Sequence, residues 1–493
     1  MLGSYDNAIA AVRVLLRSFF RHIEVSGSEH VPASGGGLFV ASHPNGLIDP
    51  ALIATSCPRP IVFGARHGLF AWPLVGQLLR AVGTVPIYRA ADARSAPGQD
   101  DESARRQRNK QSLDALAQAV AGGSLAALFP EGVSHDAPSL SELKVGIAKV
   151  YYRAAELADR AAAAPFIVPV GLYYDDKTVF RSRALVAFNP PIALPEALRR
   201  MPEDASPESE RAQTSALMAE IERALCDVVH PTESWQLHFV MQRVRSLLRA
   251  ERANRAGVRL PESNMQERTL GFERVWRGYA LVRQREPERS AALYQRVERY
   301  DRELRTLGLS DEDLDGSPRL LSRWLPALLV LQALLVYGFL PPILIAGALI
   351  NFVPYRLLGL IASATAKTGK DVATVKLFGG LVLFPLAWGG AAALAALGVI
   401  DLSAAFPAVP RVPWSAAACT VALGVVGGAL ALRYAELTRQ TWHALRIRLT
   451  RQRRRMSIAW LRTERAALHD AIAEMAEGVP LPGVVAHGGK VVR

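Results

Sequence analysis

Cysteine is scarce in this sequence of 493 residues. Its three cysteines, Cys57, Cys226 and Cys419, stand far apart, with no C-x-x-C pair and no nearby set of histidines. This spacing speaks against a disulfide framework and against a structural zinc site. The first residues, MLGSYDNAIA, include an acid and no basic residue, so no secretory signal is expected. Internal repeats are also lacking.

Negative charge is the rarer sign. The formal net charge is +13, which predicts an acidic partner: nucleic acid, anionic lipid or a phosphorylated substrate. The arginine-rich stretch from Arg433 to Arg455 directly follows a long apolar segment, as basic residues do on the cytoplasmic side of a membrane. Because no nucleic-acid recognition motif accompanies the charge, we expect anionic membrane lipids as partners and no nucleic acid.

The length predicts two or more domains. Residues 8–20 are apolar with two arginines four positions apart, too short to cross a bilayer, so residues 1–20 are expected to form an interfacial amphipathic helix. Residues 21–200 alternate short apolar runs (GLFVAS, SLAALFP, FIVPVGLYY, ALVAF) with helix-like segments at 104–121 and 141–160. This alternation predicts an α/β domain with a mixed sheet flanked by helices.

A charged, helical pattern covers residues 201–320, and we expect a helical arm there. A C-terminal α-helical membrane region follows at 321–432, and a basic helical tail at 433–493. Three runs in the membrane region carry no charge: Trp324–Tyr355, Leu377–Ile400 and Val412–Leu432. The second and third fit single spans, since about 20 apolar residues cross the hydrocarbon core.

The first uncharged run has an awkward length. As one helix it would measure about 48 Å, against the roughly 30 Å of the hydrocarbon core. The segment 356–376 is rich in lysine and the tail in arginine, which predicts that both are cytoplasmic and that only 401–411 lies outside. A re-entrant hairpin over 324–355, broken at Pro341-Pro342, would keep the N-terminal domain inside; a full span would place it outside.

Four stretches of the α/β domain share one arrangement, in which an apolar strand ends in polar or glycine-rich residues. They are SHPNGLID (42–49), GTVPIYR (83–89), FPEGVS (129–134) and IVPVGL (167–172). In open α/β sheets, ligands bind at the carboxyl ends of the strands. His43 and Asp49 in the first stretch fit either a solvated surface loop or a general base with the carboxylate that orients it.

The order and content of these stretches resemble the glycerolipid acyltransferase superfamily, which includes the glycerol-3-phosphate and lysophosphatidate acyltransferases. The resemblance runs from about residue 20 to 195, with FPEGVS close to the third motif of that family and GTVPIYR fitting its second. One departure is the spacing: the usual first motif has four residues between histidine and aspartate, and here five separate His43 from Asp49. The longer form is similar to a subgroup typified by fungal glycerol-3-phosphate and dihydroxyacetone-phosphate acyltransferases.

This resemblance implies an O-acyltransferase in which the first motif supplies the base. An imidazole, with an unperturbed pKa of about 6.5, can take the proton of an alcohol as the alcohol attacks a thioester. Asp49 would fix the tautomer of His43, as in hydrolase triads, with the substrate hydroxyl in place of serine. Five intervening residues do not place both side chains on one helix face, so we expect His43 in the loop before a helix, with the Asn45-Gly46 turn absorbing the extra residue.

Substrate-binding residues follow from the remaining motifs. Arg89 is expected to clamp a phosphate through paired hydrogen bonds, or else to be an exposed surface arginine. Glu131 would hold Arg89 or a glycerol hydroxyl, or else be a structural turn acid. Arg66 matches a basic position of the family. Gly132, Ser134 and Lys144 complete the predicted site. Lys144 and Gly146 on the following helix could contact the phosphate or the acyl carrier, but they fit a scaffold role better. Ser134 lacks a G-x-S-x-G elbow, which speaks against a nucleophile.

The sequence therefore predicts a multi-pass enzyme of the cytoplasmic membrane, with its catalytic domain on the cytoplasmic face. It would move a fatty acyl group from acyl-CoA or acyl-carrier protein to glycerol 3-phosphate in phospholipid synthesis. Lysophosphatidate is the alternative acceptor, and a lysophospholipid transacylase the alternative activity. No metal and no cofactor beyond the acyl thioester is implied.

Overall fold

The computed structural model describes residues 2–88, 102–158, 164–202, 204, 206–258, 261–315, 325–334, 341–365, 369–486 and 490–492. The chain divides into two compact units, one of residues 1–235 with 368–374 and one of residues 236–367 with 375–493. The first unit contains the predicted α/β domain and extends past residue 200, to Trp235.

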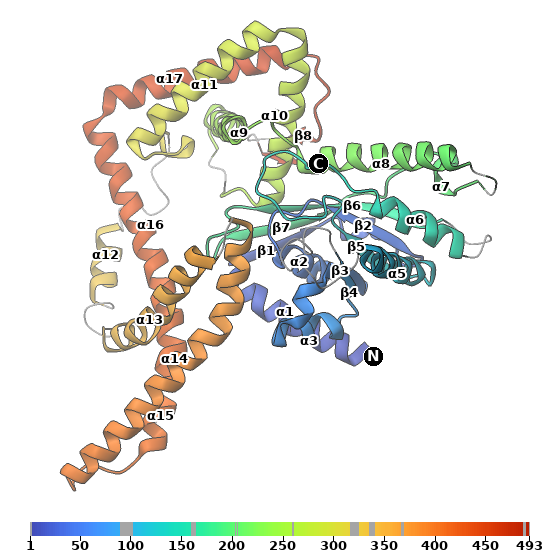
Figure 1. Ribbon diagram of the computed structural model, residues 1–493. Coiled ribbons are helices and arrows are strands. Elements are labelled where there is room, and N and C mark those ends of the chain that lie inside the picture. The colour runs from blue at the N-terminus through green and yellow to red at the C-terminus, as the bar shows by residue number, and fades with distance from the viewer. Residues whose placement is uncertain are drawn as a thin grey trace. The chain divides into compact units, whose positions relative to one another are not determined.

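A seven-stranded sheet forms the centre of the first unit, in the order β1-β7-β6-β2-β5-β3-β4 (Figure 1). All neighbouring strands are parallel except β6 and β7, which are antiparallel. The carboxyl ends of β6, β2, β5, β3 and β4 therefore meet at one edge of the sheet, where ligands bind in such folds. The strands are β1 (His22–Ser26), β2 (Gly37–Ala41), β3 (Ile61–Arg66), β4 (Val85–Ile87), β5 (Leu125–Leu128), β6 (Phe166–Tyr174) and β7 (Arg183–Phe188).

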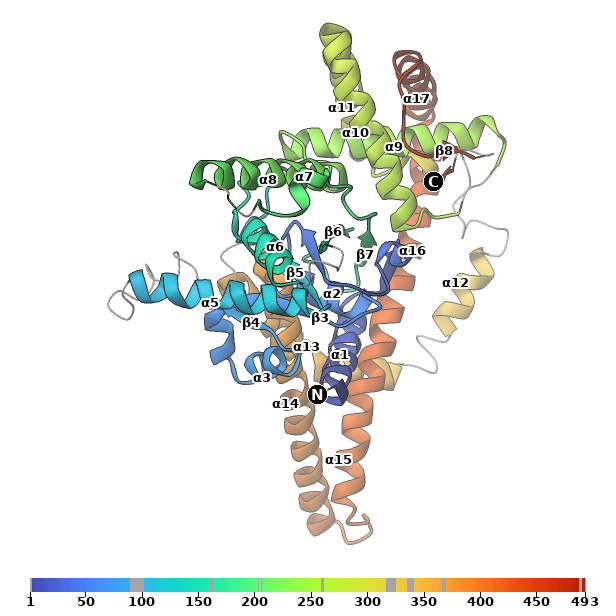
Figure 2. The ribbon, with the colours of Figure 1, turned by 90° about the vertical axis from the view of Figure 1, so that its right-hand side faces the viewer.

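Helices cover both faces of this sheet, which confirms the predicted fold class (Figure 2). Leu38 and Val40 of β2 point to one face, where they pack in a common core with α5 (Glu102–Ala121), α6 (Gly146–Leu157) and α8 (Pro207–Val229). Phe39 points to the other face, where its ring lies 5.6 Å from that of Phe188. The other helices of the unit are α1 (Leu2–Phe19), α2 (Ile48–Ser56), α3 (Pro73–Ala81) and the short α7 (Glu196–Arg199).

Two expectations about helices of the first unit need adjustment. Helix α1 buries Ile9, Val12, Leu16 and Phe19, so the apolar face that was expected at a membrane surface packs against the protein. An interfacial role for α1 remains a prediction, and it would have to use the opposite face, on which Val14 is exposed. Helix α6 begins only at Gly146 rather than at residue 141, so Lys144 precedes the helix on which it was expected.

In the second unit, the predicted arm and the predicted tail share one helical bundle. Side chains of α9, α10, α11, α16 and α17 form its core, in which Leu247, Tyr300, Leu304, Leu461 and Leu468 have no exposed surface. Figure 1 shows α11 and α17 side by side, although more than a hundred residues separate them in the chain. The elements are α9 (Trp235–Arg255), α10 (Met265–Arg285), α11 (Pro287–Leu307), α16 (Gly428–Arg453), α17 (Arg455–Met475), β8 (Val484–Val485) and β9 (Val491–Val492).

Apolar helices make up the remainder of the second unit: α12 (Leu325–Leu334), α13 (Pro341–Thr365), α14 (Gly369–Ala405) and α15 (Pro413–Ala422), which a π-helical turn at Leu423–Gly427 joins to α16. Among the described residues, three segments are long and apolar enough to cross a membrane: Ile343–Thr365, Val372–Ala405 and Pro413–Arg453. Helix α13 begins at the predicted break and continues past Tyr355 into the segment predicted as a loop. Whether it spans or re-enters remains a prediction.

Close backbone packing joins two of these helices. A Cβ atom built on Gly347 of α13 would lie 2.5 Å from the Cα atom of Gly427. Beside this crossing, the Asn351 amide donates to the Gly424 carbonyl at 2.8 Å and accepts from the Trp388 indole at 3.0 Å. Small residues and side-chain amides at a helix crossing are typical of membrane-embedded helix pairs.

Candidate active site

His43 and Asp49 meet at the carboxyl edge of the sheet. His43 lies in the loop between β2 and α2, and Asp49 lies in the first turn of α2, as the spacing predicted. The Nδ1 atom of His43 is 2.8 Å from the Oδ2 atom of Asp49. The turn between them includes Gly46, whose φ of +41° lies in the left-handed region that glycine adopts without strain.

This contact fixes the chemistry of the imidazole. A carboxylate can only accept, so the ring proton is assigned to Nδ1 and Nε2 is left as an acceptor. The His43 side chain is 18% exposed, whereas the Asp49 side chain is fully buried. Phe129, which follows β5, stacks on the His43 ring with 4.1 Å between centroids and 17° between planes. The ring is thus held from its side and its face, and Nε2 can take a proton from a bound hydroxyl.

The Asp49 carboxylate has two further donors. The Asn45 backbone N–H donates to Oδ2 at 2.7 Å, and the Tyr174 hydroxyl donates to Oδ1. Burial and the neighbouring carboxylate raise the pKa of Tyr174 well above its usual value, so its hydroxyl keeps its proton and remains a donor. With these donors and His43, the buried charge is compensated without a cation.

Glu131 ties two loops together. Its side chain is 2% exposed, and its Oε1 atom accepts the His43 backbone N–H at 3.3 Å. Its Oε2 atom accepts the Ser141 N–H at 3.1 Å and contacts the His135 ring. The backbone N–H of His135 donates to the backbone carbonyl of His43 at 3.1 Å. In this arrangement Glu131 positions the backbone of His43, which is similar to the role of a structural turn acid. A contact of Glu131 with Arg89 or with a substrate hydroxyl remains a prediction.

The other predicted residues of this loop lie differently. Gly132 has a φ of +69°, so the turn requires the left-handed conformation. Ser134 is half-buried in the same loop. The Lys144 ammonium is largely exposed and pairs with Glu142 at 2.9 Å, while its backbone N–H donates to the Pro130 carbonyl at 2.7 Å. These contacts support a scaffold role for Lys144.

Of the two predicted phosphate-binding arginines, Arg66 is among the described residues. Arg66 is exposed and ends β3, at the same edge as His43. Arg89 lies outside the described residues; β4, the strand before it in the chain, ends at Ile87 and pairs with β3 so that Ile87 stands opposite Arg66.

Sequence reasoning missed several residues that build this site. Tyr174, Phe129 and His135 contact the His43–Asp49 pair or its loop, and Lys177 donates to the Pro44 carbonyl at 2.9 Å and pairs with Asp136 at 2.5 Å. Each of these residues follows or ends a strand whose carboxyl end was expected at the site. This position in the sequence is the feature from which they could have been predicted. Within the described ranges, no three His, Cys, Asp or Glu side chains are placed to hold a metal ion.

Known proteins that are similar to this chain are described as acyltransferases. The family model described as acyltransferase matches residues 22–173. An uncharacterized acyltransferase of Schizosaccharomyces pombe is 23% identical over 469 residues, which cover 78% of this chain and 67% of that protein. Glycerol-3-phosphate O-acyltransferase 2 of Saccharomyces cerevisiae is 32% identical over 189 residues. That match covers 38% of this chain and 23% of the yeast protein, so the chain corresponds to less than a quarter of that relative.

Among solved structures, the chain is similar to the 1-acyl-sn-glycerophosphate (LPA) acyltransferase, PlsC, of Thermotoga maritima. The TM-score is 0.30 and the identity 16%, over 45% of this chain and 79% of that one. Residues 22–173, which include the buried Asp49 and the His43 imidazole that it orients, are the part of the chain that matches the acyltransferase family model.

Proposed function

We propose that the chain transfers a fatty acyl group from a thioester to a hydroxyl of glycerol 3-phosphate. The 2.8 Å contact between His43 Nδ1 and Asp49 carries this proposal, because it leaves Nε2 free to act as a base at the open edge of the sheet. Nε2 takes the proton of the acceptor hydroxyl as the hydroxyl oxygen attacks the thioester carbonyl. The tetrahedral intermediate then expels the thiolate, which receives that proton from the imidazolium. An oxygen ester forms, a thioester breaks, and no covalent enzyme intermediate is required.

The acceptor assignment rests on phosphate-binding chemistry and on the relatives. Arg66 ends β3 at this edge, and Arg89 is the last residue of the motif GTVPIYR, which contains β4. The named Saccharomyces cerevisiae relatives are glycerol-3-phosphate O-acyltransferases. Lysophosphatidate remains the alternative acceptor, and the donor is the thioester of coenzyme A or of acyl-carrier protein.

The membrane arrangement is part of the same proposal. Both substrates are cytosolic, so the acyltransferase domain is placed on the cytoplasmic face of a multi-pass protein of the inner membrane. The arginine-rich end of α16, which includes the largely exposed Arg439, then lies against anionic lipid headgroups. Reporter tags after residue 310, within 356–376 and after residue 440 should all be cytoplasmic, and a tag within 401–411 should be outside. Labelling of the tag after residue 310 from outside would place the domain in the wrong compartment for thioester chemistry.

An acyltransferase assay on membranes that contain the protein tests the proposed reaction. They are supplied with labelled palmitoyl-CoA and either glycerol 3-phosphate or lysophosphatidate, and the lipid products are separated. We expect lysophosphatidate as the product from glycerol 3-phosphate, with His43→Ala lowering kcat by about 10²- to 10⁴-fold at unchanged membrane content. Product formation only from added lysophosphatidate would assign the alternative acceptor, and a His43→Ala variant with normal turnover would refute the proposed base.

A further inference from the structure

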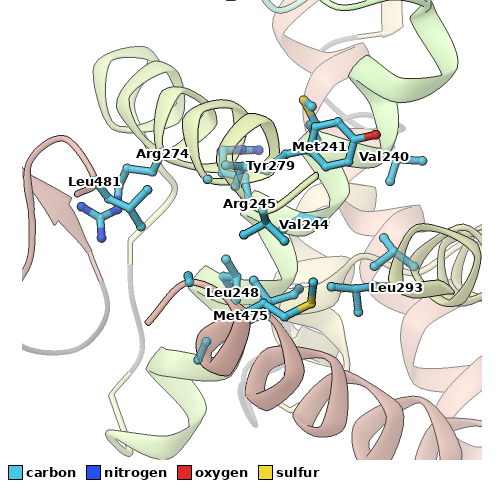
Figure 3. A pocket seen from close by; sticks show the side chains of 18 of the residues that line it. Val240, Met241, Val244, Arg245, Leu248, Arg274, Tyr279, Leu293, Met475 and Leu481 are labelled. Carbon is cyan, nitrogen blue, oxygen red and sulfur yellow. The ribbon is translucent and has the colours of Figure 1, made fainter. Parts of the chain in front are cut away.

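A second candidate site lies in the helical bundle of the second unit. A cavity of about 150 Å³ opens among α9, α10, α11 and the end of α17. Figure 3 shows side chains of these four helices converging on it, with Arg245 and Arg274 among the apolar groups. A cavity of about this volume, when apolar, takes up a hydrocarbon the size of benzene. The apolar part of the lining includes Val244, Leu248, Val275, Leu293, Val297 and Met475.

Arginines form the polar part of the lining. Arg245, Arg252 and Arg274 all border the cavity, and within the described part of the chain no carboxylate pairs with any of them. The Arg274 guanidinium donates to the Pro482 and Gly483 carbonyls, at 2.6 and 2.7 Å. Neither the Arg245 nor the Arg252 guanidinium donates a hydrogen bond to another described residue.

A fourth lining arginine provides the contrast. Arg249 pairs with Glu267 at 2.8 Å and with Glu312 at 2.7 Å, so its charge is compensated. Glu267, the acid in the lining, is therefore already engaged. Among the described residues that line the cavity, four arginines face a single acid, so the wall carries an excess of positive charge that an anion would offset.

The position of Arg245 is built into the packing. Its aliphatic stem crosses Gly271 of α10 so closely that a Cβ atom there would lie 3.0 Å from Arg245 Cγ. Burial, together with the nearby Arg268 and Arg249 charges, lowers the pKa of Arg245 to about 10, although the Glu267 and Asp311 carboxylates act in the opposite direction. Burial also lowers the pKa of Arg252. Both groups stay protonated at neutral pH, and both are partly buried.

We propose that this cavity binds a single-chain amphiphile that carries a phosphate head group. The head group would lie between Arg245 and Arg252, and the first part of the chain would fill the apolar interior. A phosphate is favoured over a carboxylate because its two charges and several acceptor oxygens suit more than one unpaired guanidinium. Neither the acyl-transfer reaction nor His43 takes part, so the proposal is independent of the proposed function.

The test uses dodecyl phosphate with a terminal diazirine, added to the full chain in phosphatidylcholine nanodiscs. After illumination, labelled peptides are mapped by mass spectrometry. We expect saturable labelling of peptides from α9, α10 or α17, displaced by unlabelled dodecyl phosphate at similar concentration and by inorganic phosphate or dodecanol only at far higher concentrations. Arg245→Gln and Arg252→Gln should each weaken binding about 10- to 100-fold, the usual effect of losing a charge-assisted hydrogen bond. Arg299→Gln, the same exchange on the exposed side of α11, is the matched control and should leave binding unchanged.

Folding is checked in the same variants. Removing Arg245 relieves the cost of burying its charge beside Arg268 and Arg249, which outweighs the attraction of Glu267 and Asp311, so the melting temperature should stay the same or rise. Leu293→Trp, which fills the cavity without changing its charge, should displace the chain and weaken binding as well. Labelling confined to residues 22–173, equal binding of dodecanol, or unchanged binding by folded Arg245→Gln and Arg252→Gln variants would each overturn the proposal.

Discussion

Replacing Asp49 by asparagine tests the acyltransferase site at its most buried contact. The exchange keeps the size of the side chain and removes its charge. In the structure the two carboxylate oxygens of Asp49 accept from His43, Asn45 and Tyr174. An asparagine has only one acceptor oxygen, and its amide donates. Either one donor loses its acceptor, or the amide faces His43 Nδ1 and forces the imidazole proton onto Nε2.

Both outcomes lower turnover. A hydrogen bond to a charged group contributes about 1.5–3 kcal/mol, and each 1.4 kcal/mol is tenfold in rate, so the lost contact alone predicts a fall of about 10- to 150-fold. A shift of the proton to Nε2 removes the base altogether, and the same exchange in a serine protease triad costs about 10⁴-fold. We therefore expect kcat of Asp49→Asn to fall by about 10²- to 10⁴-fold. The KM for the thioester should change little, because Asp49 is fully buried and orients the base rather than the donor.

The assay follows release of free coenzyme A with a thiol reagent at saturating substrates. Asp175→Asn is the matched control, because Asp175 directly follows Tyr174 and pairs with Arg183 at 2.7 Å. Its activity should stay within about twofold of the unmodified protein, as for a surface ion pair. A His43→Ala, Asp49→Asn double variant should be no slower than His43→Ala alone, since the two residues act as one unit. A kcat of Asp49→Asn within threefold of normal, or losses that simply multiply in the double variant, would refute the orienting role.

Three further outcomes follow from the structure and the sequence. Tyr174→Phe removes one donor to Asp49 and should lower kcat by about 3- to 10-fold with the KM values unchanged; a kcat equal to that of the unmodified protein would show that this hydrogen bond does not contribute. Arg89→Ala should raise the KM for the phosphorylated acceptor and spare that for the thioester, with poor rescue by lysine, which cannot form the paired contact; an unchanged acceptor KM would contradict the phosphate assignment. Gly347→Val should lower the melting temperature in detergent, because its Cβ atom would overlap Gly427, whereas Gly359→Val, at an open position of the same helix, should not.

The catalytic pair could be predicted from the sequence because its chemistry is local. An apolar run, a Pro-Asn-Gly turn and a histidine separated by five residues from an aspartate together specify a loop before a helix, and the structure has that arrangement. Tyr174 and Glu131 were harder, because their partners lie 125 and 88 residues away in the chain. Their contacts depend on which strands are neighbours, and the order β6-β2-β5 is not written in any one segment. What the sequence does show is that both residues end or follow a strand, which already places them at one edge.

The helical bundle could not be predicted from the sequence for a related reason. The charged segment 201–320 was interpreted as a helical arm or scaffold, and charge usually marks exposed faces. In the structure, several of these charges lie inside and face charges of the distant tail. Arg465 of α17 has no exposed surface, donates to Glu251 of α9 at 2.9 Å and to the Asp311 carbonyl at 2.8 Å, and pairs with Asp315. Composition alone does not distinguish a charged side chain that is exposed to solvent from one that is buried in an ion pair between helices of a bundle.

The arginines of this bundle therefore fall into two groups, those whose charge is paired with a carboxylate and those whose charge is not. Arg243 pairs with Asp301 and Asp311, and Arg465 with Glu251. Breaking such a buried pair costs about 3–5 kcal/mol, because the remaining charge is left without a partner. Arg245 and Arg252, at the wall of an apolar cavity, form no ion pair with another described residue. An anion from outside the chain is the partner that we propose for these two guanidinium groups.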